Sequence, residues 1–313
     1  MRLLTVGTGK GAGIAEMFSK SGARVNNVNL FKTFAIVSSL DELKMLRHID
    51  DGKKFYTVYR DGEVDIRSVF NNIISFNELF EASLVICDLS DDFSFYSSMR
   101  VGEELHATTE EPRICLSVSP ELDSPEGVNL TFMRIKHLMK SFDFLFLFEK
   151  RYGYEDVILK TFNTLSLVGE IDVKKQMSGE VVVDTSDFVN SLSKDGISIA
   201  GITNEKLPMK ILRRLKRVGM SETIAERTER MMRMFDMAVK NVGARADINS
   251  AKKGLIVFSG DPDEITMDGM FECIKSMERI NPAMMVRYGD YPVPNSNELN
   301  AVVVFSGIKK FRL

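Results

Sequence analysis

The chain of 313 residues has no tryptophan, only three cysteines, only three histidines and no long apolar run. The cysteines (Cys87, Cys115, Cys273) are far apart in apolar segments, which favours reduced thiols over disulfides or a zinc site. The dispersed histidines predict neither a histidine-based catalytic centre nor a metal site. No apolar segment approaches the length that spans a bilayer, and the first residues lack a signal-peptide pattern. We therefore expect a cytoplasmic protein that does not insert into a membrane.

An excess of positive charge is also missing. Lys and Arg number 41 against 44 Asp and Glu, so the net charge is −3. This balance excludes a strongly basic surface, and we expect no nucleic-acid partner. The length and the apolar content of 44% are ordinary for a globular protein with one or two domains.

The first half of the chain alternates apolar runs with segments of helical periodicity. Continuous apolar strands separated by helices are typical of a parallel sheet with both faces covered. Ligands of such sheets bind at the carboxyl ends of the strands. The predicted strands are 2–7, 33–39, 82–90, 113–119 and 142–150, and the predicted helices are 13–21, 41–49 and 128–142.

The second half predicts a smaller α/β unit. A helix at 154–168 leads out of the first sheet, and a long Met-rich helix is expected over 206–242, with its methionines in the core. We expect an α/β fold in three parts. These are a Rossmann-like, parallel-sheet nucleotide-binding domain (1–152), a central connecting helix (153–178) and a C-terminal α/β domain (179–313). The strands predicted in the last part are 196–202, 253–260, 283–291 and 299–308, with a helix at 267–280.

A glycine-rich turn follows the first predicted strand. Glycines stand at every second position of "VGTGKGAG": Gly7, Gly9, Gly11 and Gly13. A strand, a glycine turn and a helix together present backbone N–H groups to an anion. The same pattern is also expected for a tight strand–helix connection that binds nothing, so two interpretations remain open.

The turn matches neither of two familiar phosphate loops. A P-loop would continue from Lys10 to Ser or Thr, but Gly11 follows. The dinucleotide fingerprint would have a third glycine at Ala12 and an acid after the second strand. That strand ends instead in Ser38 and Ser39.

The C-terminal third gives a more specific signal. The segment "KGLIVFSGDPDEITMDGMFECIKSMERINPAMMVRYGDYPVPNSNELNAVVVFSGI" (253–308) resembles the C-terminal domain of FtsZ and its archaeal relatives in the tubulin superfamily. The order of strand, acidic linker, helix and strands fits that family, as do the glycines Gly254, Gly260, Gly289 and Gly307. The opening turn then resembles the first phosphate loop, and "FAIVSSLDELKML" resembles the second strand and loop of archaeal members.

This resemblance implies a tubulin/FtsZ-like fold and a guanine nucleotide, GTP or GDP, with or without magnesium. The residues expected to bind it are Gly7, Gly9, Lys10, Gly11, Gly13, Ser38, Ser39, Ser97 and Ser98.

A third match is "EVVVDTSDFVNSL" (180–192), which resembles the family's N-x-D-x-x-D loop. Asp184 and Asp187 occupy the acidic positions, and Val182 replaces the asparagine. In the family this loop reaches the nucleotide of the next subunit and positions the attacking water, so the resemblance implies catalytic roles for both acids. Taken alone, Asp184 or Thr185 could equally cap a short helix.

The sequence departs from the family after the third predicted strand. The family has G-G-G-T-G-[ST]-G there, whereas no glycine occurs here between Ser90 and Val101. Asp88, Asp91 and Asp92 instead bring carboxylates to the expected phosphate position, where they repel phosphate unless a cation intervenes.

Three functions follow. The first is a cytoskeletal protein that binds guanine nucleotide and self-associates head to tail in a protofilament, at most a slow GTPase acting across a subunit interface. The alternative is a degenerate member without nucleotide, a structural or regulatory partner of a related tubulin-like filament protein. A nicotinamide-dependent Rossmann enzyme is the third, disfavoured because the acid that would bind the ribose is missing.

Overall fold

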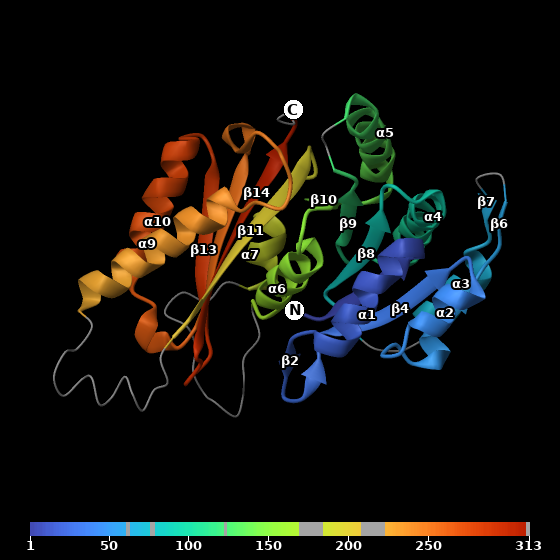
Figure 1. The fold of residues 1–313 in the computed structure, drawn as a ribbon, viewed down its shortest axis with the longest axis horizontal. Coiled ribbons are helices and arrows are strands. Elements are labelled where there is room, and N and C mark those ends of the chain that lie inside the picture. Colours follow the sequence, from blue (N-terminus) through green and yellow to red (C-terminus); the bar gives the residue numbers. More distant parts are fainter. Residues whose placement is uncertain (61–62, 76–78, 122–123, 169–183, 208–222, 311–313) are drawn as a thin grey trace.

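The computed structural model describes residues 1–60, 63–75, 79–121, 124–168, 184–207 and 223–310. They form an α/β structure around one ten-stranded sheet with the order β13-β12-β14-β11-β10-β9-β8-β1-β4-β5 (Figure 1). The strands of the first half are β1 (Leu3–Thr8), β4 (Phe31–Val37), β5 (Lys54–Tyr56), β8 (Ala82–Asp88), β9 (Arg113–Ser119) and β10 (Phe144–Glu149). Those of the second half are β11 (Ile197–Lys206), β12 (Lys253–Gly260), β13 (Met285–Pro292) and β14 (Glu298–Ile308).

Helices cover both faces of the sheet, because successive strand residues point to opposite sides. The first-half helices are α1 (Ala12–Ser21), α2 (Leu40–Met45), α3 (Arg67–Ile74), α4 (Asp92–Thr108), α5 (Pro125–Ser141) and α6 (Tyr154–Ser166). The second half has α7 (Thr185–Asn190), α9 (Ile224–Lys240) and α10 (Met267–Ile280). Buried side chains of α1, α6 and α7 join one apolar cluster, and those of α3, α4, α5, α9 and α10 join the other.

Short elements complete the described residues. Two small hairpins are formed by β2 (Arg24–Val25) with β3 (Val28–Asn29), and by β6 (Tyr59–Arg60) with β7 (Glu63–Val64). Turns of 3₁₀ helix are η1 (Gly9–Gly11), η2 (Asp51–Lys53), η3 (Ile248–Ser250) and η4 (Pro262–Glu264).

The predicted α/β fold class is confirmed. Every predicted strand is present, and the first-half strands are parallel. The sheet continues into the second half, since β10 pairs with β11 at Phe146 and Ser198. β14 then runs antiparallel to β11 and β12. The domain limits remain predictions.

Several predictions need correction. α3, α4, β5 and the β6–β7 hairpin were not predicted. The long helix expected over 206–242 is helical in the described residues only from Ile224, because β11 extends to Lys206. Met231 and Met234 fill the core as predicted, whereas Met237 is 45% exposed. Residues 208–222 and 169–183, which include much of the predicted central helix, lie outside the described residues.

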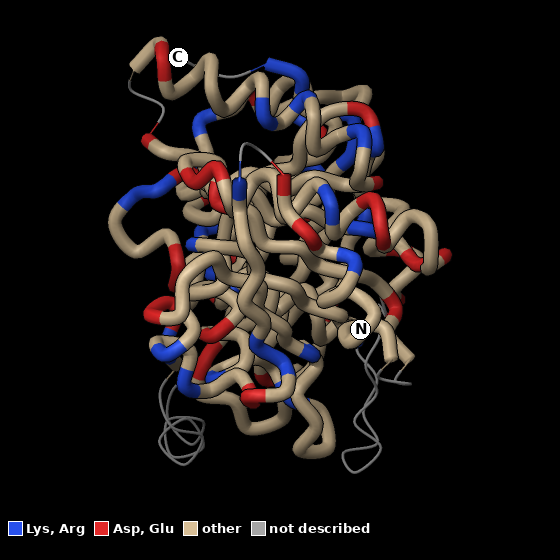
Figure 2. Tube along the Cα trace, turned by 90° about the vertical axis from the view of Figure 1, so that its right-hand side faces the viewer, with Lys and Arg blue, Asp and Glu red and all other residues tan. Residues whose placement is uncertain are grey.

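The parallel strands of the first half all begin at one end of the sheet and finish at the opposite end. We call the end where β1, β4, β8, β9 and β10 finish the carboxyl edge, and the end where they begin the amino edge. Within the described ranges, no helix is long and apolar enough to cross a membrane. Acidic and basic residues are interspersed over the face seen in Figure 2.

Candidate functional site

The carboxyl edge brings together most of the residues predicted to bind phosphate. The glycine turn follows β1, Ser38 and Ser39 follow β4, and the acidic segment follows β8. β1 lies between β4 and β8, in register at Thr8–Ile36 and Gly7–Ile86, so the three turns are neighbours. The structure therefore brings these three predicted segments together, and their role in binding stays a prediction.

Close contacts explain the glycines of the opening turn. Gly9 has φ +50°, and a Cβ atom there would lie 2.3 Å from Asp91 Oδ2. A Cβ at Gly11 would lie 2.4 Å from the carbonyl oxygen of Ile86. Gly7 packs in the same way against α1, while Gly13 is exposed with open space beside it. Glycine at positions 9 and 11 thus lets the chain's own α4 and β8 approach the turn.

A carboxylate of the same chain occupies the turn. The backbone N–H of Lys10 donates to Asp91 Oδ2 at 3.0 Å. Asp91 is the N-cap residue of α4, yet its side chain accepts no capping hydrogen bond from that helix. An N-cap aspartate usually accepts from its own helix. Here the carboxylate supplies an anion to η1 and α1, which carry no acid in their first turns.

Cations of the same chain balance the other two acids. Asp88 forms an ion pair with Lys150, which follows β10; the distance between Asp88 Oδ2 and Lys150 Nζ is 2.7 Å. Arg134 of α5 pairs with Asp92 and also donates to the carbonyl of Leu89 at 2.7 Å. The repulsion expected among the acids is therefore relieved without a ligand.

The structure corrects the expected role of two serines. Ser97 and Ser98 are fully buried, so their side chains do not face an open phosphate site. Ser98 Oγ lies 2.7 Å from Thr8 Oγ1, and Ser94 Oγ donates to the carbonyl of Thr8 at 2.6 Å. These hydroxyls fasten α4 to the end of β1.

The remaining predicted residues have mixed positions. Ser39 caps α2 by accepting from the N–H groups of Asp41 and Glu42 at 3.1 and 3.2 Å. Ser38 is partly buried on the same edge, and the Lys10 side chain is exposed.

Aromatic side chains pack against one another at the start of α4. Tyr59 of the β6–β7 hairpin stacks on Tyr96 and meets Phe93 edge-on, both at 6.0 Å between ring centroids. Burial, together with the charge of Asp92, raises the pKa of Tyr59. Phe93 and Phe95 are buried. The rings thus fill the volume beside the turn.

The two predicted catalytic acids lie on the amino edge. Asp184 caps α7, because its Oδ1 accepts the N–H of Asp187 at 2.7 Å. That bond lowers the pKa of Asp184. Asp187 forms an ion pair with Arg287 of β13 at 2.5 Å. The cap interpretation is confirmed, and any catalytic role stays a prediction. Val182 lies outside the described residues.

In this arrangement the Lys10 N–H already donates to Asp91, so a phosphate of the implied guanine nucleotide could accept from it only if Asp91 moved away. Among residues that the structure describes, no group of three or more His, Cys, Asp or Glu side chains is placed to hold a metal ion.

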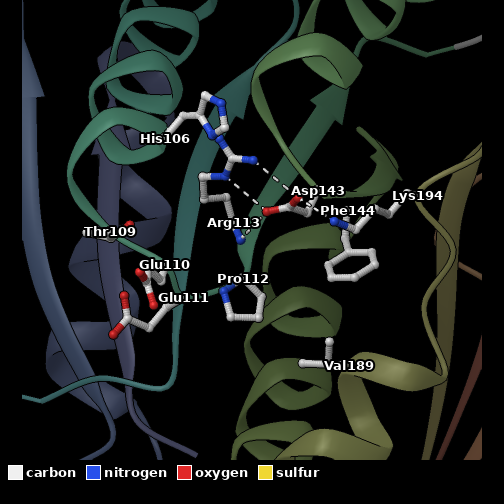
Figure 3. Close-up of a pocket in the computed structure, with 10 residues that line it drawn as sticks. All are labelled: His106, Thr109, Glu110, Glu111, Pro112, Arg113, Asp143, Phe144, Val189 and Lys194. Atoms are coloured by element: carbon white, nitrogen blue, oxygen red, sulfur yellow. Dashed lines mark hydrogen bonds and ion pairs between the residues drawn. The ribbon is translucent and has the colours of Figure 1, made fainter.

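The amino edge also contains a pocket of about 380 Å³ (Figure 3). It lies where β9 and β10 begin, next to the ends of α4 and α7. Arg113 and Asp143 point toward each other across it, joined by two side-chain hydrogen bonds of 3.0 and 3.2 Å. The full lining is His106, Thr109, Glu110, Glu111, Pro112, Arg113, Asp143, Phe144, Val189 and Lys194.

Solved structures with this fold define the class of protein. A GDP-bound monomer of CetZ1 from Haloferax volcanii superposes with a TM-score of 0.80 at 20% identity, covering 99% of this chain and 95% of that one. A GTPγS-bound protofilament of CetZ2 from the same organism gives 0.78 at 17% identity, covering 100% and 95%. An FtsZ dimer from M. jannaschii gives 0.72 at 15%, covering 100% and 93%. The chain therefore has the tubulin/FtsZ fold.

Sequence comparison narrows the class to a family. The profile described as "Tubulin-like CetZ, C-terminal domain" matches residues 151–312. The chain belongs to the tubulin-like CetZ family. It is 27% identical to CetZ1 of H. volcanii over 50% of this chain and 42% of CetZ1. It is 22% identical to CetZ4 over 98% of this chain and 88% of CetZ4.

Proposed function

We propose that this chain is a tubulin-like assembly protein of the cytoplasm that works with its opening turn filled by Asp91 rather than by a guanine nucleotide. It associates head to tail with copies of itself or with a related tubulin-like protein. The observation that carries the proposal is the hydrogen bond from Lys10 N–H to Asp91 Oδ2.

Head-to-tail association is supported by the positions of the two edges. The opening turn and the two acids, Asp184 at the N-cap of α7 and Asp187 within it, lie at opposite ends of the parallel strands, so one contact can join the two edges of successive copies. Such a heterologous contact does not close on itself and produces an open filament. CetZ2, a relative with the same fold, has been solved as a protofilament.

GTP hydrolysis is not part of the proposal. Asp184 caps α7, and Asp187 is paired with Arg287 inside the chain. A carboxylate has several acceptor sites, so these contacts alone would not prevent it from binding a water molecule, but they give each acid a role in holding the fold. We therefore assign both acids a structural role.

Guanine-nucleotide binding is the second candidate. The exposed Lys10 side chain beside the turn favours it, as do the GDP and GTPγS named for the related CetZ1 and CetZ2 structures. This candidate requires Asp91 to leave the turn when nucleotide binds.

Isothermal titration with GTP and magnesium separates the two candidates. We expect no binding by the parent protein at millimolar ligand. We expect Asp91→Ala to gain binding of GTP or inorganic pyrophosphate, because Lys10 N–H loses its acceptor. Asp92→Ala removes the same charge one residue later and should gain nothing. Tight, guanine-selective binding by the parent protein would contradict the proposal.

A further inference from the structure

We propose that Tyr152 of one copy docks in the amino-edge pocket of the next copy. This inference rests on the proposed head-to-tail association and identifies the side chains that make the contact.

Tyr152 is presented as an exposed anchor. Its relative exposure is 107%, so the ring projects fully from the loop between β10 and α6. The loop is held on both sides, because the N–H of Lys150 donates to the carbonyl of Ser119 and that of Tyr154 donates to the carbonyl of Arg151, both at 3.0 Å. A large aromatic side chain on a fixed loop loses little conformational freedom on binding, and such residues are frequent binding hot spots.

The amino-edge pocket offers a pre-formed receptor. Asp143 accepts from the side chain of Arg113 and from Lys194 Nζ, the latter at 2.9 Å, which fixes one wall. Phe144 and Val189 supply apolar surface, and Figure 3 shows the Phe144 ring beside Pro112. Arginine also stacks on aromatic rings, so Arg113 suits a tyrosine.

The topology places the two features at opposite ends of one strand. Tyr152 follows the last residue of β10, Glu149, by three positions, and the pocket includes Phe144, the first residue of β10. A repeat of the molecule along the strand direction therefore brings Tyr152 of one copy toward the pocket of the next. An edge-to-edge contact related by a two-fold axis would not do so, because it joins like edges.

A cation stands beside Tyr152, and the rim of the pocket is acidic. Arg151, beside Tyr152, is 41% exposed at its side chain and pairs with the buried Glu149. The pocket is lined by three carboxylates against the two cations Arg113 and Lys194, and Glu110 is exposed at its rim. Opposite charges across a contact favour encounter of the correct surfaces.

Sedimentation of purified protein over a range of concentrations measures the contact. We expect Tyr152→Ala to weaken self-association about 30-fold, the effect of losing a hot-spot side chain. Phe132→Ala on the outer surface of α5 removes another exposed ring, 39% exposed, and should change nothing. Tyr152 is fully exposed, so thermal melting should be unchanged in Tyr152→Ala.

A mixing experiment tests the direction of the contact. Glu110→Arg reverses the charge at the pocket rim and should also weaken self-association, while it leaves Tyr152 intact. At a concentration where Tyr152→Ala and Glu110→Arg are each monomeric alone, their mixture should form a dimer and nothing longer, because one intact pair of surfaces remains. A parent protein that stays monomeric would overturn the self-association in the proposed function and this inference with it. A parent that associates no more tightly than Tyr152→Ala, or a mixture that forms no dimer, would overturn this inference alone.

Discussion

The two edges of the sheet differ in how they are filled. At the carboxyl edge, the glycine turn is in close contact with Asp91, Phe93 and the backbone of β8. At the amino edge, Arg113 and Asp143 brace a pocket that stays open. Relatives with this fold have been solved with GDP and with GTPγS. In this chain the turn has the glycines, but side chains of the same chain contact them. We infer that contact between copies depends on complementary side chains rather than on a bound phosphate.

The largest effect on stability is expected when an added methyl group crowds the glycine turn at the carboxyl edge. Gly11→Ala should lower the free energy of unfolding by about 3 kcal/mol, because its Cβ would meet a strand carbonyl that cannot move freely. Gly13→Ala is the matched control, since nothing lies within 4 Å of the added atom. It should be neutral or stabilising by up to about 1 kcal/mol. Urea unfolding of both variants measures the difference, and equal stabilities would show that the turn is not tightly packed.

The next largest effect on stability is expected at the amino-edge pocket. Asp143→Asn should cost about 2 kcal/mol, because it removes charge-assisted hydrogen bonds from Arg113 and Lys194. Burial raises the pKa of Asp143, but those bonds outweigh it and hold the pKa at about 2.

The pH dependence of Asp143 follows from that pKa. Its folded value is below the unfolded one, so its contribution is complete above about pH 4 and is lost as the pH falls toward 2. The gap between parent and Asp143→Asn, measured by urea unfolding, should be wide at pH 7 and narrower at pH 3. A gap that widened on acidification would contradict this assignment.

A smaller loss of stability is expected when the Asp91 carboxylate is removed. Asp91→Ala should lower the free energy of unfolding by about 1 kcal/mol, as for other lost capping side chains. Inorganic pyrophosphate should raise the melting temperature of Asp91→Ala and leave that of the parent unchanged. Asp92→Ala removes an exposed carboxylate from its pair with the mostly buried Arg134 and should cost no more than about 1 kcal/mol. If pyrophosphate stabilised the parent as much as Asp91→Ala, Asp91 would not be occupying an anion site.

The smallest effect on stability is expected at Asp187 in α7. Asp187→Ala should cost less than about 1 kcal/mol, because its ion pair with Arg287 is partly exposed. High salt should reduce the difference further by screening. A loss above about 2 kcal/mol in urea unfolding would mean that this pair is more than a surface contact.

The fold was largely predictable from the sequence, because buried parallel strands are continuous apolar runs such as "RICLSVS". The chemistry of the turn was not. Asp91 and Lys10 are 81 residues apart, and no local pattern shows that an N-cap side chain turns away from its own helix. Ser97 and Ser98 have suitable chemistry for phosphate, but the unpredicted helix α4 directs both into the core. The cations that balance the acids, Lys150 and Arg134, likewise come from distant elements.

The most direct test of the central claim is the nucleotide dependence of self-association. Protein stripped of nucleotide should be compared by sedimentation without addition, with GDP and with GTP plus magnesium. The account predicts the same association constant in all three conditions, because the turn already holds Asp91. Association that appears only with GTP would contradict it.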